Sequence, residues 1–420
     1  MNVSLLRAVD RWLGVPAAAL LTLHRRLLGR AAPDGPIRTI LFVKLAEQGS
    51  TVLAAGALQA AIARVGREHV FFLAFEENRL VLDAMSLIPR DNVLTLDVST
   101  PAAAARSGLA LLHRLREIRP DAAIDLEFFA RSSAIFTFLS GAGRRVGLHA
   151  HAGGGPYRGD LMTHRLVFNP YLHTSQAFLL AVTALDQAGR RFPAFPVPAP
   201  DVMPPEIAWQ PAADDLEAVR RLLPEATAAR DVPSPLEAPA SRDLPPMVLL
   251  NANCSDLLPL RRWPADRFVE LAKRLLAARP ELHVLFTGGP EEAADTACLA
   301  AEVSSTRCLS VAGRTTFGQL LALYSVAQVL VTNDSGPAHF ATLTGIDIVT
   351  LFGPETPLLF AARTPRNHVL WSAMACSPCV SALNNRQSTC RESLCMQAIS
   401  VDQVFAAAMS AYTSRVTGRA

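Results

Sequence analysis

Short apolar runs alternate along most of the chain with longer segments whose apolar residues recur at helical spacing. In the first half, the runs predict strands and the longer segments predict helices. The predicted strands are 37–43, 70–75, 92–96 and 122–126, and the predicted helices are 52–65 and 102–119. This alternation indicates βαβ units, and therefore a parallel sheet covered by helices.

The same alternation resumes after a stretch in which prolines gather, between 193 and 246, around one predicted helix at 213–223. Such a composition is typical of a linker. The later predicted strands are 247–251, 283–287, 329–331 and 346–352, and the later predicted helices are 265–278, 291–303, 316–324 and 338–344. We therefore predict two α/β domains, 37–195 and 247–420, which face each other across a cleft. A linker at 196–246 joins them, a separate segment at 1–36 precedes them, and the second domain ends in a helix.

Polar loops follow three predicted strands of the second half. The carboxyl ends of parallel strands meet at one edge of a sheet, where open α/β folds bind anionic ligands. Arginine suits a diphosphate, and a carboxylate can accept hydrogen bonds from ribose hydroxyls. Each loop alone is equally typical of a turn or a helix cap, but the three together favour a nucleotide-sugar site. The candidate donor-binding residues are Asn253, Ser255, Arg261, Thr287, Glu292, Asp334, Ser335, Gly336 and His339.

The loop 44–51, after the first predicted strand, carries a single carboxylate, Glu47. A general base must come within hydrogen-bond reach of the hydroxyl that it deprotonates. Glu47 is our candidate base; the alternative is that it only favours the N-terminus of the following helix. Further basic residues of the first half suit an acidic or sugar acceptor, although ordinary surface loops explain them equally well. We assign Lys44, Arg131 and His164 to acceptor binding.

The chain of 420 residues is 50% hydrophobic and has a net charge of +3. It can bury a large core, and its charge does not indicate a nucleic-acid partner. No uncharged apolar run is long enough to predict a spanning helix. Near the N-terminus, the apolar block 13–23 is flanked by arginines on both sides, unlike a signal peptide. It predicts a helix on a membrane surface or, as the alternative, a helix packed on the first domain.

Four of the seven cysteines cluster within 376–395. Cys376, Cys379, Cys390 and Cys395 follow the pattern C-x2-C-x10-C-x4-C, which is compatible with a structural zinc ion. Two disulfides or four reduced thiols fit the same pattern. Without a signal peptide we expect a reducing compartment, which disfavours disulfides.

Several of these segments resemble the motifs of glycosyltransferase family 9, the lipopolysaccharide heptosyltransferases. The resemblance runs from about residue 37 to the C-terminus and implies the GT-B fold, with two Rossmann-like domains. The most specific match is Asn333-Asp-Ser-Gly-Pro-Ala-His-Phe-Ala341 with Leu351-Phe-Gly-Pro354. Further matches are Arg262-Trp-Pro264, Gly288-Gly-Pro-Glu-Glu292 and Cys376-Ser-Pro-Cys379.

The resemblance implies inverting transfer of heptose from ADP-heptose to the lipopolysaccharide core, without a catalytic metal or other required cofactor. It also implies a cytoplasmic protein, peripheral on the inner membrane, whose partners are a nucleotide-sugar donor and a lipid-linked glycan acceptor. By resemblance, Arg261 stands where a lysine usually holds the donor diphosphate, and Glu292 stands where the ribose is held. Asp334, Ser335, Gly336 and His339 match the surroundings of the phosphates and the donor sugar.

The departure from the family lies in the loop 44–51. The family's loop usually ends in Leu-Gly-Asp, with the aspartate as general base, whereas Ser50 stands in that place here. A serine is not a base at neutral pH, so either Glu47 has taken over or the chain is a catalytically weak or silent member that binds nucleotide-sugar or glycan as a scaffold. A nucleotide-sugar epimerase of similar build is a further alternative. Our main prediction is an inverting glycosyltransferase.

Overall fold

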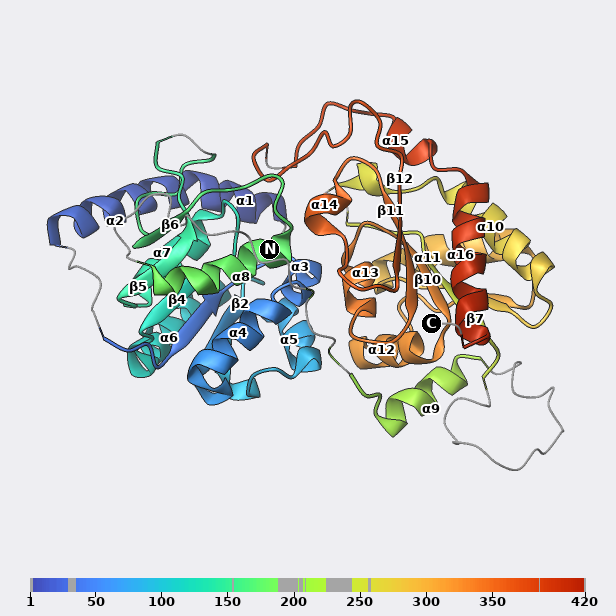
Figure 1. Cartoon of the computed structure of the whole chain (residues 1–420), viewed down its shortest axis with the longest axis horizontal. Helices are drawn as coiled ribbons and strands as arrows, with labels where there is room; N and C mark the ends of the chain where they lie inside the picture. Colours follow the sequence, from blue (N-terminus) through green and yellow to red (C-terminus); the bar gives the residue numbers. More distant parts are fainter. Residues whose placement is uncertain are drawn as a thin grey trace. The chain divides into compact units, whose positions relative to one another are not determined.

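The computed structural model describes residues 3–28, 35–152, 155–187, 203, 207, 209–223, 244–255, 258–384 and 386–418. It divides into two compact units (Figure 1). The N-terminal unit comprises Met1–Pro205 together with Ala382–Arg386, and the C-terminal unit comprises Glu206–Ser381 together with Gln387–Ala420. Most of the predicted linker lies outside the described residues.

The N-terminal unit contains one parallel sheet with the strand order β3-β2-β1-β4-β5-β6. Its strands are β1 (Ile40–Val43), β2 (Val70–Phe75), β3 (Val93–Leu96), β4 (Ala122–Asp125), β5 (Arg144–Leu148) and β6 (His164–Leu166). Its helices are α1 (Val3–Trp12), α2 (Gly14–Leu28), α3 (Gln48–Val52), α4 (Ala55–Val65), α5 (Arg79–Met85), α6 (Pro101–Ile118), α7 (Arg131–Leu139) and α8 (Thr174–Thr183). The strand order reverses between β1 and β4, which is the switch point of a doubly wound sheet.

The C-terminal unit repeats this topology in the order β12-β11-β10-β7-β8-β9, with its switch point between β7 and β10. Its strands are β7 (Met247–Asn251), β8 (His283–Phe286), β9 (Cys308–Ser310), β10 (Val329–Asn333), β11 (Asp347–Phe352) and β12 (Asn367–Trp371). Its helices are α9 (Ala213–Arg221), α10 (Ala265–Ala278), α11 (Ala293–Val303), α12 (Phe317–Val326), α13 (Gly336–Ala341), α14 (Pro357–Phe360), α15 (Leu394–Gln397) and α16 (Val401–Val416).

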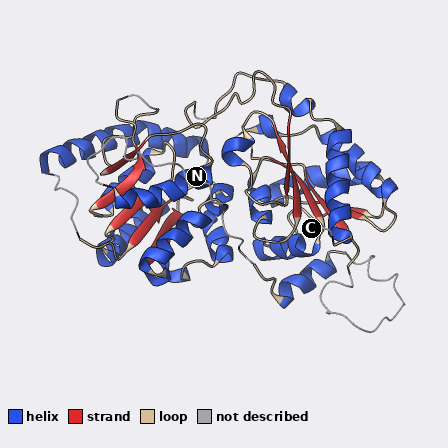
Figure 2. Ribbon diagram, viewed as in Figure 1, coloured by secondary structure: helices blue, strands red, loops and turns tan. Residues whose placement is uncertain are grey.

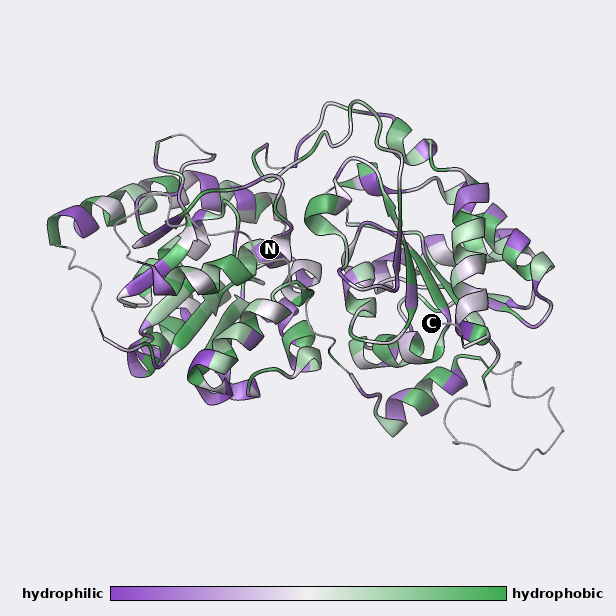
Figure 3. Cartoon of the chain, in the orientation of Figure 1, coloured by the Kyte–Doolittle hydropathy of each residue, from purple (hydrophilic) through white to green (hydrophobic). Residues whose placement is uncertain are grey.

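The central strands are apolar on both faces, because helices cover both sides of each sheet (Figure 2). Every residue of β1, β7 and β10 is buried, so these strands read as continuous apolar runs rather than as alternating ones. Figure 3 shows the same concentration of hydrophobic residues in the strands. This burial explains why the sequence pattern located the central strands.

Most predicted elements are confirmed, with shifts of a few residues at their ends, but the periphery of each sheet was missed. The structure adds β5, β6, β9 and β12, whose short or partly polar sequences gave no clear pattern. The predicted loop 44–51 was wrong in its second half, because α3 begins at Gln48. The helix predicted at 338–344 is α13, which begins at Gly336 and ends at Ala341.

The N-terminal helices pack on the first domain. Helix α2 lies against α7 and buries its small residues Gly14, Ala18 and Thr22. The Thr22 hydroxyl accepts a hydrogen bond from the backbone N–H of Asp160 at 2.8 Å, and the Asp160 carboxylate pairs with Arg25. The predicted alternative of a packed helix is therefore confirmed. Across the described part of the chain, no helix is both long enough and apolar enough to cross a membrane.

Close approach of α2 depends on Gly159, which has a positive φ of 78°. A Cβ at this position would lie 2.9 Å from the Ala18 carbonyl oxygen and 2.8 Å from the Thr22 hydroxyl. We expect Gly159→Ala to cost about 1 kcal/mol in backbone strain and a further ~1–3 kcal/mol from overpacking. Urea unfolding measures both contributions.

The matched control is Gly141→Ala, because Gly141 has a similar φ of 76° but no atom within 4 Å of an added Cβ. It should show the strain cost alone. Equal losses of unfolding free energy in the two variants would mean that the contact between α2 and residue 159 does not limit stability.

Candidate active site

The loops that follow β7 and β10 are joined by the amide of Asn333. Its Nδ2 donates to the carbonyl oxygens of Ala252 at 3.1 Å and Asn253 at 3.2 Å, and its Oδ1 accepts from the backbone N–H of Trp263 at 3.0 Å. Asn333 is fully buried, so these bonds satisfy its polar atoms where water is excluded. This organising role was missed, since Asn333 looked like part of an ordinary turn.

Arg261 and Asp334 meet at the switch point of the C-terminal sheet. Arg261 ends a short 3-10 helix, Pro259–Arg261, and its Nη1 lies 3.6 Å from the Asp334 carboxylate. The Arg261 side chain is 16% exposed, and within the described residues its buried Nε has no hydrogen-bond partner. A buried, incompletely paired guanidinium can bind a further anion at this position.

The loop after β8 lies beside the loop after β7. The carbonyl oxygen of Thr287 accepts from Asn253 Nδ2 at 3.3 Å, which connects the two loops. The Glu292 carboxylate accepts from the backbone N–H of Gly289 at 2.7 Å and so caps the short helix Pro290–Glu292. A Cβ at Gly288 would lie 2.7 Å from Asn253 Nδ2 and 2.8 Å from Glu292 Oε2, so these polar groups crowd around a glycine.

The loop after β10 leads into α13 through Ser335, whose hydroxyl donates to the Asn333 carbonyl oxygen at 3.1 Å. Helix α13 has six residues, which limits the dipole that could favour an anion at Gly336. His339 is buried on this helix, whereas Ser255 in the neighbouring loop is exposed. The positive charge of Arg261 is therefore the stronger electrostatic element of this site.

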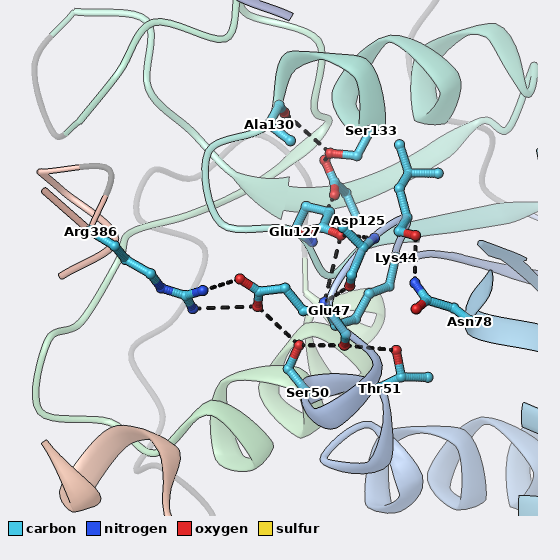
Figure 4. Close-up of polar contacts among 12 residues, drawn as sticks. Lys44, Glu47, Ser50, Thr51, Asn78, Asp125, Glu127, Ala130, Ser133 and Arg386 are labelled. Atoms are coloured by element: carbon cyan, nitrogen blue, oxygen red, sulfur yellow. Dashed lines mark hydrogen bonds and ion pairs between the residues drawn. The ribbon is translucent and has the colours of Figure 1, made fainter. Parts of the chain in front are cut away.

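In the N-terminal unit, Lys44 lies beside Glu47 and contacts the loop that carries it (Figure 4). Lys44 is buried, donates to the Ala46 carbonyl oxygen at 2.8 Å and lies 3.6 Å from the Glu127 carboxylate. That carboxylate accepts from the backbone N–H of Ala46 at 2.9 Å. The structure thus gives Lys44 an internal supporting role, and acceptor binding by Lys44 stays a prediction.

The loop after β4 is held in the same way by Arg158. This fully buried guanidinium pairs with the Asp125 carboxylate at 2.5 Å and donates to the carbonyl oxygens of Phe128 at 3.0 Å and Ala130 at 2.8 Å. Ser133 also donates to Asp125, at 3.2 Å (Figure 4). Arg158 and Asp125 fix the loop that presents Glu127 at the switch point. Nothing in the local sequence around Arg158 indicated this function.

Glu47 stands at the N-cap position of α3 in a left-handed conformation, with a φ of 67°. Ser50, one helical turn later, donates to Glu47 Oε2 at 3.1 Å. Arg386 donates to both carboxylate oxygens, at 3.3 Å for Oε2 and closer for Oε1. Burial raises the pKa of Glu47. The charges of Arg386 and Lys44 and the hydrogen bonds from Arg386 and Ser50 have the larger effect, and the pKa falls to about 2.

The other two candidate acceptor residues have internal partners. Arg131 Nη1 lies 3.1 Å from the Asp10 carboxylate, which also accepts from the backbone N–H groups at the start of α7. His164 is buried on β6, with its ring Nε2 at 3.1 Å from the Gln187 carbonyl oxygen, and burial lowers its pKa. Their part in acceptor binding stays a prediction.

A structural zinc ion at the four clustered cysteines stays a prediction. None of the seven cysteines forms a disulfide, and no group of three or more metal-binding side chains occurs in the described ranges, which include the four clustered cysteines. Cys376 and Cys390 are exposed, while Cys395 is buried on α15 beneath Gly353, where an added Cβ would lie 3.1 Å from its sulfur. Of the three alternatives, the two disulfides are absent from this segment.

Comparison with known proteins identifies the family. The family model described as glycosyltransferase family 9 (heptosyltransferase) matches residues 109–389. This match covers more than half of the chain, and the chain therefore belongs to glycosyltransferase family 9. It is 36% identical over 101 residues to lipopolysaccharide heptosyltransferase 2 of Salmonella typhimurium and 35% identical over 101 residues to that of Escherichia coli K12. Each alignment covers 24% of this chain and 29% of the relative.

Two solved structures show the fold over nearly their whole length. The E. coli ADP-heptose LPS heptosyltransferase II has a TM-score of 0.64 at 18% identity, covering 90% of this chain and 99% of that one. A family 9 glycosyltransferase from Veillonella parvula has a TM-score of 0.66 at 18% identity, covering 91% and 99%. These likenesses, with the two doubly wound sheets, confirm the predicted GT-B fold.

Proposed function

We propose that this chain is an inverting glycosyltransferase that moves a sugar, heptose from ADP-heptose, to a lipopolysaccharide core or a related surface-glycan acceptor. The observation that carries the proposal is the pair of polar clusters at the two switch points. The cluster of the C-terminal unit presents the Arg261 guanidinium, which can bind a diphosphate. The cluster of the N-terminal unit presents the Glu47 carboxylate, which can accept a proton. Family membership supports this choice of donor, and so does the ADP complex of the structurally similar E. coli heptosyltransferase WaaC.

In this reaction, the acceptor hydroxyl oxygen attacks the anomeric carbon from the face opposite the donor diphosphate. The bond from that carbon to the diphosphate oxygen breaks, and the nucleoside diphosphate leaves with the electron pair. Glu47 takes the hydroxyl proton, and Ser50 orients the Glu47 carboxylate through its hydrogen bond. Arg261 stabilises the negative charge that develops on the departing diphosphate, so the proposed route needs no catalytic metal.

We expect Glu47→Gln to lower kcat about 10²- to 10⁴-fold, because the amide cannot accept the proton. Ser50→Ala should lower kcat much less, since it removes only an orienting hydrogen bond. The assay measures sugar transfer from ADP-heptose to lipopolysaccharide core, and calorimetry measures the affinity for ADP. Unchanged ADP affinity in both variants is the control for folding.

A full transfer rate in Glu47→Gln would remove Glu47 as the base. ADP binding by the wild-type chain without transfer to any acceptor would favour the second candidate function, a catalytically silent binding protein. The ion pair between Arg386 and Glu47 is the observation that makes this second function worth testing, because it leaves the carboxylate with little affinity for a proton.

We expect Arg261→Met to weaken ADP binding about 10- to 100-fold, which corresponds to the loss of a charge-assisted hydrogen bond. Arg261→Lys should stay within a few fold of the wild type, since it keeps the charge that the family usually places there. Calorimetry with ADP checks both variants. Equal affinity in Arg261→Met and the wild type would exclude Arg261 from the donor site.

The N-terminal helices support a location on a membrane surface. Helix α2 turns its small residues and Leu21 inward, whereas its other leucines are exposed, as are large apolar residues of α1. This N-terminal apolar face comprises Leu5, Val9, Trp12, Leu13, Leu20, Leu23, Leu27 and Leu28, all exposed. The exposed Arg7, Arg11 and Arg26 lie among them on the same two helices. Apolar residues with flanking arginines suit the interface of an anionic bilayer, and we assign the chain to the cytoplasmic face of the inner membrane.

We expect the double variant Leu20→Glu, Leu27→Glu to bind vesicles of phosphatidylglycerol and phosphatidylethanolamine at least about 100-fold more weakly, because each of the two leucines contributes at least ~1.5 kcal/mol when buried. The matched control is Leu109→Glu on α6, since Leu109 is 71% exposed and Leu27 is 72% exposed. Vesicle sedimentation measures the effect. Equal binding by the double variant, or an equal loss in Leu109→Glu, would contradict a role for the N-terminal apolar face.

A further inference from the structure

A distant part of the chain supplies a partner to the proposed base. Residues Ala382–Arg386 belong to the N-terminal unit, although the chain on both sides of them belongs to the C-terminal unit. This short strap brings Arg386 to Glu47, 339 positions earlier in the chain. In Figure 4 the guanidinium points directly at the Glu47 carboxylate, and dashed lines join it to both oxygens.

Both partners are held in an unusual backbone conformation. Glu47 has a φ of 67° and Arg386 a φ of 55°, in the left-handed region that residues other than glycine seldom occupy. Such conformations persist where the surroundings impose them, and they gather at ligand-binding and switch regions. Here they aim two side chains at each other from loops that are far apart in the sequence.

The pair remains accessible to a ligand. The side chain of Arg386 is 22% exposed and that of Glu47 is 36% exposed. An ion pair that solvent reaches is weakly held, so a competing anion can replace one partner. By contrast, the pair of Arg158 and Asp125 behind it is fully buried and cannot exchange in this way.

The pairing conflicts with the chemistry proposed for Glu47. A carboxylate that accepts hydrogen bonds on both oxygens from a guanidinium has little remaining affinity for a proton. The transfer step therefore requires that Arg386 move away from Glu47 when the acceptor hydroxyl arrives. A guanidinium gives up a carboxylate at least cost when another oxyanion replaces that carboxylate. Its N–H donors can bind a carboxylate or a phosphate with two parallel hydrogen bonds.

We propose that Arg386 recognises an anionic group of the acceptor, a phosphate or a carboxylate near the attacking hydroxyl, and that Glu47 occupies this place until the acceptor binds. Exchange of partners then holds the acceptor and frees the base in one event. The inference rests on the proposed glycosyltransferase function. It adds a specificity residue that the resemblance did not indicate and a reason why the free enzyme keeps its base paired.

The test uses Arg386→Gln in the full chain, with ADP-heptose as donor and lipopolysaccharide core oligosaccharide as acceptor. Three forms of the acceptor are compared: untreated, after enzymatic removal of phosphate, and after chemical reduction of its carboxylates. We expect the variant to raise KM for the untreated acceptor about 10- to 100-fold. The difference between variant and wild type should vanish for the form that lacks the recognised anion, which identifies phosphate or carboxylate as the source.

In the variant, kcat at saturating acceptor should stay within a few fold of the wild type, because Arg386 has already left Glu47 in that complex. The acid limb of kcat/KM, which reports the free enzyme, should move to higher pH in Arg386→Gln. The pKa of Glu47 rises in this variant, because the charge and hydrogen bonds of Arg386 that lower it are lost. Burial, which raises the pKa, remains. Arg386→Lys should restore part of the KM effect, since lysine keeps the charge without the fork.

Arg114→Gln is the matched control, because Arg114 forms a comparable ion pair with Glu117, at 2.9 Å, on helix α6 of the same unit. It should change neither KM nor the pH profile. If Arg386→Gln raised KM equally for all three acceptors, or lowered kcat greatly, Arg386 would have only a structural role and the proposal would be overturned. Unchanged KM with the untreated acceptor would also overturn it.

Failure of the proposed function is distinguishable from failure of this inference by calorimetry without a donor. If the wild-type chain transfers no sugar but binds the untreated oligosaccharide about 10- to 100-fold more tightly than Arg386→Gln does, anion recognition by Arg386 stands and catalysis fails. If transfer occurs and Arg386→Gln binds the oligosaccharide as the wild type does, catalysis stands and the inference fails.

Discussion

Parallel pairing of two strands at each switch point is the constraint on which the site depends. In the N-terminal sheet Val43 pairs with Asp125, and in the C-terminal sheet Thr332 pairs with Asn251. The crossovers on either side of such a pair run in opposite directions, so the two following loops separate and leave room for side chains. Each pairing therefore brings together polar groups about 80 residues apart, such as Ala46 with Glu127 and Asn333 with Asn253.

The loops at these points are kept in place by buried polar side chains rather than by regular structure. Lys44, Arg158 and Asn333 each donate to backbone carbonyl oxygens of the loops. Burying such groups is costly unless every partner is present, so these networks tolerate few alternative loop conformations. Glu47 differs because its ion pair with Arg386 is partly exposed, and such a pair is held less firmly than a buried one.

The N-terminal helices follow a different packing rule from the rest of the chain. Helix α2 packs its small residues inward, because Gly159 allows it to approach closely, and its leucines other than Leu21 remain exposed. A helix that served only to complete the core would bury its leucines instead. The sequence pattern left the membrane surface and the domain surface as alternatives, whereas the folded helix α2 packs on the unit through one face and exposes its other face.

The sequence by itself determined the central strands, the two-domain α/β class and the positions of the strand-end loops, because burial on both faces produces apolar runs visible without any contacts. It also placed Arg261 and Asp334 in loops that follow strands of the second domain. Only the tertiary structure decided which side chains meet. The local sequence could not show that the buried Lys44 donates to its own loop, that the clustered cysteines form no disulfide, or that Arg386 reaches Glu47. Such contacts depend on strand order and on chain crossings between distant segments, which leave no local periodicity.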